Sequence, residues 1–176
     1  MSLFRRALAQ HRPSKVARRW VFVSYDQLSA EVGPLSREDP RTLGIVVVEC
    51  PEKAARRPYH KQKLALVLAN LRHFALEQAG RGIDVRHVVA GSYAEAVASV
   101  VQETGPLRMM RPAERELRVE LAPLVASGEL QEVPHEGWLT SRSDFDASQS
   151  GPPWRMDAFY RHVRREQIGR ASCRER

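Results

Sequence analysis

The chain has 176 residues, a length that suits one α/β domain with a sizeable core. Hydrophobic residues make up 43% of it and charged residues 28%, which indicates a globular body. The longest apolar run, residues 64–69, is too short to cross a bilayer, so we expect no membrane association. The cysteine usage, with too few informative cysteines for an internal disulfide, favours a cytoplasmic location.

The formal net charge is +7, but the basic residues are concentrated at the two ends of the chain. Residues 1–20 carry six Arg or Lys side chains and no acid, and residues 168–176 carry three arginines against one glutamate. The remainder is close to neutral, which argues against a nucleic-acid-binding protein that acts through a basic surface. We interpret residues 1–19 as a basic lead-in; a transit peptide is the alternative for such an Arg-rich stretch.

The last nine residues, IGRASCRER, carry a separate signal. Their reverse translation, ATC GGA AGA GCG TCG TGT AGG GAA AGA, resembles a widely used sequencing adapter in the correct frame. We therefore interpret residues 168–176 as adapter read-through and expect a longer protein whose reading frame is cut near residue 167. Cys50 is then the one informative cysteine, which favours a reducing compartment, and no Cys or His pair has zinc-site spacing.

Apolar runs and helical spacing predict five strands and four helices in the chain. The predicted strands are Trp20–Ser24, Gly44–Glu49, Val85–Val89, Leu107–Met110 and Leu130–Val133. The predicted helices are Tyr59–Ala79, Tyr93–Thr104, Ala113–Ala126 and Pro153–Arg165. The first helix has the clearest apolar face, made of Leu64, Val67, Leu68, Leu71, Phe74 and Ala75. Residues 45–48 are apolar at every position, which is typical of a strand buried on both faces.

This alternation of strands and helices predicts a Rossmann-like, doubly wound, mainly parallel five-stranded sheet with helices on both faces. The crossover from residue 26 to residue 43 has room for little helix, with one short turn near Ser36–Arg41. We assign residues 20–140 to the sheet domain. Residues 141–167 are assigned to a linker, rich in Ser, Asp, Gly and Pro up to residue 153, and to the start of a connection to a further domain. The last helix is rich in apolar bulk, so we expect an exposed patch and self-association.

Polar residues follow the predicted strands where these end. In open α/β sheets, ligands bind outside the carboxyl ends of the strands, where the winding reverses. The candidate ligand-binding residues at this edge are Tyr25, Asp26, Gln27, Glu49, Cys50, His60, Lys63 and Glu114. Each of these residues, taken singly, is also common in a polar turn or at a solvent-exposed helix start. Asp26 and Glu49 together favour a binding site for a polar heterocycle with a hydroxylated chain. The sequence carries no dinucleotide fingerprint, phosphate-binding loop or nucleophile elbow, and we predict no catalytic or metal-binding residues.

Four stretches together resemble the deoxyribodipyrimidine photolyase-related family of bacterial photolyase/cryptochrome-like flavoproteins. They are YDQLS, RRPYHKQKLALVLANLRHFA, RPAERELR and GPPWRMDAFYRHVRR, and the resemblance covers about residues 20–166. It implies a Rossmann-like N-terminal domain that can hold an antenna chromophore, a ribityllumazine. In the longer members it is followed by a helical domain with FAD, often a four-iron–four-sulfur cluster, and the DNA-lesion site.

The resemblance also assigns individual residues. Asp26 matches the Asp of the family's D-Q-L turn, and Glu49 matches the acid that ends the second strand. His60 and Lys63 match the H-x-x-K start of the first long helix, and Glu114 matches the Glu after the fourth strand.

This chain departs from the family pattern at Tyr25, where many members carry Gly. The larger side chain either shrinks the pocket or stacks on a flat ring. We predict an antenna-chromophore domain of a truncated photolyase/cryptochrome-like protein whose parent performs light-driven DNA repair or light sensing. The fragment itself would be inactive, because FAD, the iron–sulfur cluster and the DNA contacts belong to the missing domain. The alternative is a stand-alone Rossmann-like module that binds a small ligand or nucleotide.

Overall fold

The computed structural model describes residues 2–11, 18–56 and 58–168. They belong to two compact units, Met1–His135 and Glu136–Arg176. Residues 12–17 of the expected lead-in, and all but the first residue of the adapter-like tail, lie outside the described residues.

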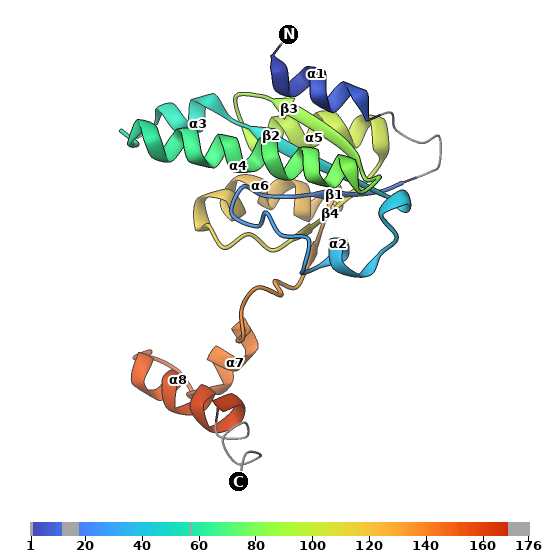
Figure 1. Cartoon of the computed structure of the whole chain (residues 1–176). Coiled ribbons are helices and arrows are strands. Elements are labelled where there is room, and N and C mark those ends of the chain that lie inside the picture. The colour runs from blue at the N-terminus through green and yellow to red at the C-terminus, as the bar shows by residue number, and fades with distance from the viewer. Residues whose placement is uncertain (1, 12–17, 57, 169–176) are drawn as a thin grey trace. The chain divides into compact units, whose positions relative to one another are not determined.

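Five strands of the first unit form a single parallel sheet (Figure 1). They are β1 (Arg19–Phe22), β2 (Leu43–Glu49), β3 (Asp84–Val89), β4 (Leu107–Met110) and β5 (Leu130–Val133), in the spatial order β3-β2-β1-β4-β5. The chain first adds strands on one side of β1 and then returns to add β4 and β5 on the other side. The direction of winding therefore reverses between β1 and β4, and the predicted doubly wound, Rossmann-like fold is confirmed.

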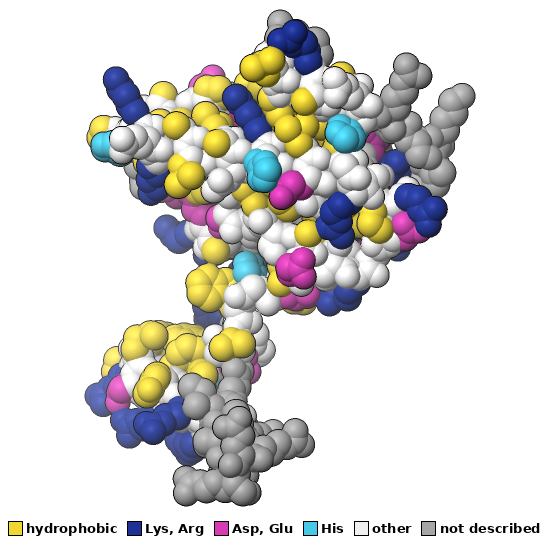
Figure 2. Space-filling model, viewed as in Figure 1, with side chains coloured by type: hydrophobic (Ala, Val, Ile, Leu, Met, Phe, Trp, Pro, Cys, Tyr) yellow, Lys and Arg dark blue, Asp and Glu magenta, His cyan; other side chains and the backbone are white. Residues whose placement is uncertain are grey.

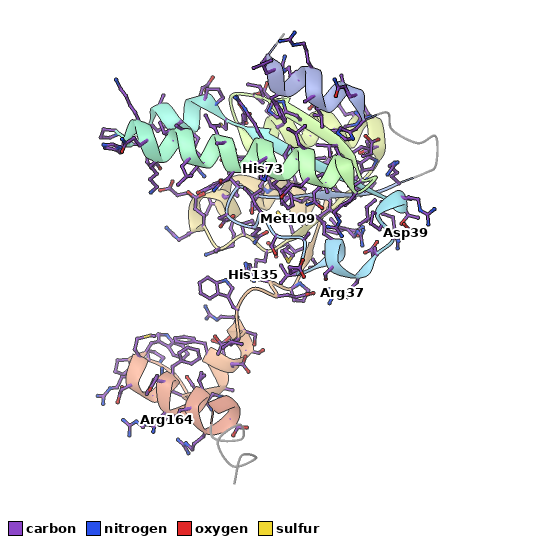
Figure 3. All side chains as sticks on the ribbon, in the orientation of Figure 1. Arg37, Asp39, His73, Met109, His135 and Arg164 are labelled. Atoms are coloured by element: carbon purple, nitrogen blue, oxygen red, sulfur yellow. The ribbon has the colours of Figure 1, made fainter. Side chains whose placement is uncertain are left out.

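Helices cover both faces of this sheet (Figure 1). Those of the first unit are α1 (Leu3–Gln10), α2 (Pro34–Arg37), the 3-10 turn η1 (Pro40–Thr42), α3 (Pro51–Ala55), α4 (Lys61–Gly80), α5 (Tyr93–Thr104) and α6 (Arg115–Ala126). Apolar residues of α5 and α6 pack with Phe22 and Val48, whereas those of α2 and α4 pack with Val21 and Ile45. Successive residues of β2 thus enter opposite cores, and all of its residues are buried. Met109 of β4, labelled in Figure 3, lies in the first of these two cores.

Helix α4 packs on the sheet mainly through its C-terminal half. In the first half of the predicted apolar face, Leu64 and Val67 are half-buried and Leu68 is exposed. Leu71, Phe74 and Ala75 are buried, but Leu68 is 37% exposed, and its neighbour Leu66 is 61% exposed. A 20-residue helix is about 30 Å long, whereas the seven residues of β2 extend about 23 Å. The helix is longer than the sheet it covers, and its spacing pattern carries no information on where the sheet ends.

The crossover between β1 and β2 contains little helix, as predicted, and tertiary contacts hold it in place. Gly33 has a φ of 67°, and a Cβ built on it would lie 2.7 Å from the sulfur of Met110, so glycine is required at this position. Farther along, Glu38 accepts hydrogen bonds of 2.7 and 3.2 Å from the guanidinium of Arg108 on β4. These contacts bind the loop to the strand at which the winding reverses.

Two stretches are more ordered than the sequence predicted. The expected lead-in contains α1, which is capped by Ser2 and contacts α4. The expected linker contains α7 (Arg142–Ala147), whose first turn is closed by a reciprocal capping box between Ser141 and Asp144. The Ser-x-x-Asp spacing was the available signal, and the surrounding polar composition concealed it.

The second unit consists of α7, α8 (Met156–Val163) and a final π-helical segment (Arg164–Ile168). Phe145 lies at the centre of its aromatic contacts, with ring centroids 5.1 Å from Trp154 and 5.3 Å from Phe159. Met156 and Tyr160 remain 70% and 59% exposed. Figure 2 shows hydrophobic side chains gathered on one side of this unit and Lys and Arg side chains on another. None of the described helices has the length and apolar content that crossing a bilayer requires.

The contact between β1 and β2 leads to a stability prediction. A Cβ on Gly44 would lie 2.5 Å from Cε3 of the buried Trp20 ring. We expect Gly44→Ala to lower the free energy of unfolding by about 1–3 kcal/mol, because the packed ring has to move. Urea denaturation measures this. The matched control is Gly80→Ala, whose new Cβ would meet nothing within 4 Å; equal stability losses in both variants would contradict the packing argument.

Candidate functional site

The residues that follow β1 and β4 meet where the winding reverses, at the carboxyl edge of the sheet, which we call the rim. Tyr25 donates its hydroxyl to Glu114 Oε2 at 2.9 Å. Gln27 donates its amide to the carbonyl oxygen of Arg111, also at 2.9 Å. Gln27 is buried because this bond satisfies its amide group. Three of the predicted site residues are therefore brought together at the predicted place.

Lys53 completes this group, and the sequence analysis did not identify it. The short helix α3, which follows β2 directly, brings Lys53 Nζ to 2.5 Å from Glu114 Oε2. The same ammonium lies 5.4 Å from the ring centroid of Tyr25 and 5.1 Å from that of Tyr93. A cation near two aromatic rings and beside a carboxylate is stabilised by both kinds of partner. We call Tyr25, Lys53, Tyr93 and Glu114 the rim cluster.

Both tyrosines of the rim cluster are neutral phenols at physiological pH. Burial raises the pKa of Tyr25 far above its ordinary value, and the hydrogen bond to Glu114 and that residue's charge raise it further. Burial is also the main cause of the raised pKa of Tyr93. Tyr93 is held in place by Glu120 of α6, whose Oε1 accepts from the backbone N–H of Tyr93 at 2.6 Å and of Ala94 at 3.2 Å.

Asp26 lies beside the rim cluster with an exposed carboxylate. Its Oδ1 accepts a 2.6 Å hydrogen bond from the hydroxyl of the buried Ser24, which fixes the direction of the side chain. The negative charge of Asp26 also contributes to the raised pKa of Tyr25, as expected for a neighbour. An exposed, oriented carboxylate can accept hydrogen bonds from a ligand.

The carboxylate of Glu49 is bonded to residues of α4 and β3. Arg72 of α4 donates two hydrogen bonds to its carboxylate, at 2.6 and 2.7 Å, and His87 of β3 lies 2.9 Å from the same carboxylate. The hydrogen bonds from Arg72 lower the pKa of Glu49 against the opposing effect of burial. Burial lowers the pKa of His87. Glu49 thus belongs to an ion pair on the α4 side of the sheet, and the structure gives it different partners from Asp26.

The remaining predicted residues have separate partners as well. Cys50 donates its thiol to the carbonyl oxygen of Gly91 at 3.0 Å. His60 caps α4 by accepting from the backbone N–H of Gln62 at 3.3 Å, and Lys63 Nζ lies 5.7 Å from the ring centroid of Tyr59. Both His60 and Lys63 are exposed. Within the described part of the chain, neither of them forms a hydrogen bond, an ion pair or a ring contact with the rim cluster.

The rim offers a defined set of chemical groups to a ligand. Asp26 supplies hydrogen-bond acceptors, Lys53 a positive charge, and Tyr25 an aromatic face with a neutral hydroxyl. Such groups suit a flat, neutral heterocycle with hydroxyl substituents. The described residues contain no group of three or more His, Cys, Asp or Glu side chains that could hold a metal ion.

The Glu49 ion pair predicts a specific dependence of stability on pH. Because the folded-state pKa of Glu49 is depressed, its stabilisation is present above its ordinary pKa of 4.5 and is lost as the pH falls through the folded-state value. We expect Glu49→Gln to cost about 2 kcal/mol of unfolding free energy at pH 7, since hydrogen bonds to a charged group are lost. The deficit should shrink below pH 4.5. Urea titrations at several pH values measure it.

The control for this experiment is Glu103→Gln, which removes a largely exposed partner of Arg86. It should cost well under 1 kcal/mol, as is usual for surface ion pairs. A Glu49→Gln deficit that stays constant from neutral to acidic pH would show that the ion pair is not its source.

The contact between Lys53 and Glu114 is testable by a double-mutant cycle. Their side chains are 13% and 23% exposed, so each single variant, Lys53→Met or Glu114→Gln, leaves a poorly solvated partner. We expect the double variant to lose less stability than the sum of the single losses, with a coupling energy of about 1–2 kcal/mol. The exposed pair of Arg86 and Glu103 should give a smaller coupling. Purely additive effects at Lys53 and Glu114 would rule out the interaction.

Comparison with known proteins agrees with this architecture. The family model of deoxyribodipyrimidine photo-lyase-related proteins matches residues 21–168. The chain is also similar to a (6-4) photolyase of Agrobacterium fabrum, with 29% identity over 157 residues, which covers 83% of this chain and 31% of the relative. The chain thus spans about a third of the length of this relative. Because the family model matches most of the described chain, including the whole sheet beyond the start of β1, the chain belongs to the deoxyribodipyrimidine photo-lyase-related family.

Proposed function

We propose that this chain is the α/β domain of a photolyase- or cryptochrome-like protein, and that its rim holds an antenna chromophore of the ribityllumazine type. Two observations support the proposal. The family model matches nearly the whole sheet domain and the second unit. In addition, the rim cluster lies where the winding of the sheet reverses, the usual ligand-binding position in open α/β sheets.

The single observation that carries the chromophore assignment is the chemistry of Tyr25, Lys53 and Asp26 at this position. Asp26 is suited to accept hydrogen bonds from the hydroxyls of a ribityl chain, because its carboxylate is exposed and oriented by Ser24. Lys53 is suited to donate to a ring carbonyl. When bound, the chromophore would supply light absorption; the residues of this chain bind it, orient it and keep water from its ring.

Tyr25 decides how a ring enters the site. Its hydroxyl donates a hydrogen bond to Glu114, and its ring makes a cation–π contact with the ammonium of Lys53. These two contacts fix the side chain where the winding reverses. In this proposal the chromophore stacks on the tyrosine ring, and Tyr25 acts as the floor of the site. Aromatic stacking of this kind contributes on the order of 1 kcal/mol beyond the burial of area.

The activity of the longer protein is part of the same proposal. The similar protein from A. fabrum is a (6-4) photolyase, and this chain spans 31% of its length. We propose that light-driven DNA repair or light sensing belongs to the longer protein. FAD, an iron–sulfur cluster and the contacts to DNA would then lie in the part that this chain does not span, and the chain by itself would be catalytically inactive.

Titration with a ribityllumazine, followed by chromophore fluorescence, tests the assignment. We expect saturable binding without FAD. Asp26→Ala should weaken it roughly tenfold to a hundredfold, since a hydrogen bond to a charged group contributes about 1.5–3 kcal/mol. The fold should survive, because Asp26 is exposed and the apolar residues of β1 are unchanged.

Glu103→Ala provides the matched control. It removes a carboxylate near the C-terminus of α5, which runs back from the rim toward the opposite edge of the sheet. Its affinity should equal that of the unmodified chain. If the unmodified chain shows no binding at high micromolar lumazine, or if Asp26→Ala binds equally well, the polar end of β1 is a turn and the proposed function fails.

A further inference from the structure

A hollow lies away from the rim, between α1 and the edge strand β3. Its volume is about 480 Å³, which is within the range typical of small-molecule sites. Arg5, Leu8 and His11 line it on the side of α1. On the other side it follows Ile83 and the first four residues of the edge strand, Asp84 to His87, and it also includes Arg18. We call this hollow the edge groove.

The edge groove combines an apolar floor with an excess of positive charge. Leu8 and the largely buried Ile83 are apolar lining residues, whereas Arg5 and Arg18 bring guanidinium groups and Asp84 is the one carboxylate among the lining residues that the structure describes. Arg86 also lines the groove, but its guanidinium pairs with Glu103 of α5 and lies over the ring of Trp20. Burial lowers the pKa of His87, and the positive charge of Arg5 lowers it further. The guanidinium of Arg5 is therefore close enough to His87 to influence its charge.

Arg18 is an unusual feature of this lining. Its side chain is only 4% exposed, and one terminal nitrogen donates to the carbonyl oxygens of Leu43 and Gly82 at 2.6 and 3.2 Å. Its Nε is buried and has no hydrogen-bond partner among the described residues. The nearest carboxylate, that of Asp84, is 3.8 Å away. A buried cation with incomplete compensation favours an additional negative charge nearby.

Helix α1 is fixed as a wall of the groove by aromatic contacts. The ring of Phe4 lies edge-on to His87, with centroids 4.9 Å apart, and the guanidinium of Arg72 lies 5.7 Å from its centroid. Ser2 caps the same helix by accepting from the backbone N–H of Arg5 at 3.3 Å. The helix precedes residue 21, where the match to the family model begins, so the groove is formed partly by residues outside that match.

We propose that the edge groove binds a small amphipathic organic anion, in which a carboxylate, sulfonate or phosphate group is attached to an apolar ring. The anionic group faces Arg5 and Arg18, and the ring lies against Leu8. This binding site goes beyond the proposed function of the rim and does not depend on it, because different residues form the two sites.

The probe for this proposal is 1-anilinonaphthalene-8-sulfonate, an aromatic anion whose fluorescence rises when it leaves water, used with the full chain. We expect one saturable site. Arg5→Gln should weaken binding about tenfold, as is typical for the loss of one charged hydrogen-bond donor. Ala9→Trp should abolish it by filling the groove, since Ala9 lines it. N-phenyl-1-naphthylamine, the analogue without the sulfonate, should bind at least tenfold more weakly.

Arg6→Gln is the matched control, because Arg6 is the neighbouring exposed arginine of α1 and does not line the groove. It should leave the affinity unchanged, and circular dichroism should show equal helix content in all variants. Equal losses in Arg5→Gln and Arg6→Gln would indicate nonspecific attraction to basic residues and overturn the proposal. So would full binding by Ala9→Trp, or displacement of the probe by a ribityllumazine, which would place the probe at the rim.

Discussion

The burial of β1 and β2 on both faces is the constraint on which the rest of the structure depends. Apolar side chains of these strands point alternately to the face covered by α5 and α6 and to the face covered by α2 and α4. Each face of the sheet therefore needs its own layer of helices. Because β1 is central and β3 and β5 are the edges, the chain has to return across the sheet after β3. That return produces the reversal point between β1 and β4, and polar residues can gather there only because the apolar strands end together.

The rim cluster illustrates how a charged side chain is accommodated near such a core. Lys53 is largely buried, yet it has a carboxylate partner in Glu114 and lies near two aromatic rings. Glu114 in turn accepts from Tyr25, so the end of β1, the start of α6 and the short helix α3 are joined through one carboxylate. Each group compensates the desolvation of another, which makes the cluster rigid and places one aromatic face and several polar atoms at the same edge.

The second buried polar group, around Glu49, has a different role. Its carboxylate joins β2 to α4 through Arg72 and to β3 through His87, and Phe4 of α1 contacts both of these partners. The group therefore fixes the position of α1, and with it the edge groove. Glu49, at the end of β2, thus holds structural elements together, whereas the residues that follow β1 form part of the proposed ligand site.

The sequence by itself determined the fold class, the boundaries of most strands, and the family. The spacing of apolar residues along the chain reflects which side chains are buried. Residues 45–48 are apolar at every position, and the strand that contains them is buried on both faces. It also identified Tyr25, Gln27 and Glu114 as residues of one edge, because the carboxyl ends of parallel strands coincide.

Only the tertiary structure decided which polar groups pair. Asp26 follows β1, and Glu49 ends the adjacent strand β2. Glu49 points toward α4 because side chains alternate along a strand, and Arg72 lies within reach there. Lys53 could not be predicted, because its role depends on a five-residue helix and on partners far away in the sequence. The length of the sheet, which leaves the first half of α4 largely exposed, is likewise a property of several segments together, and no single segment encodes it.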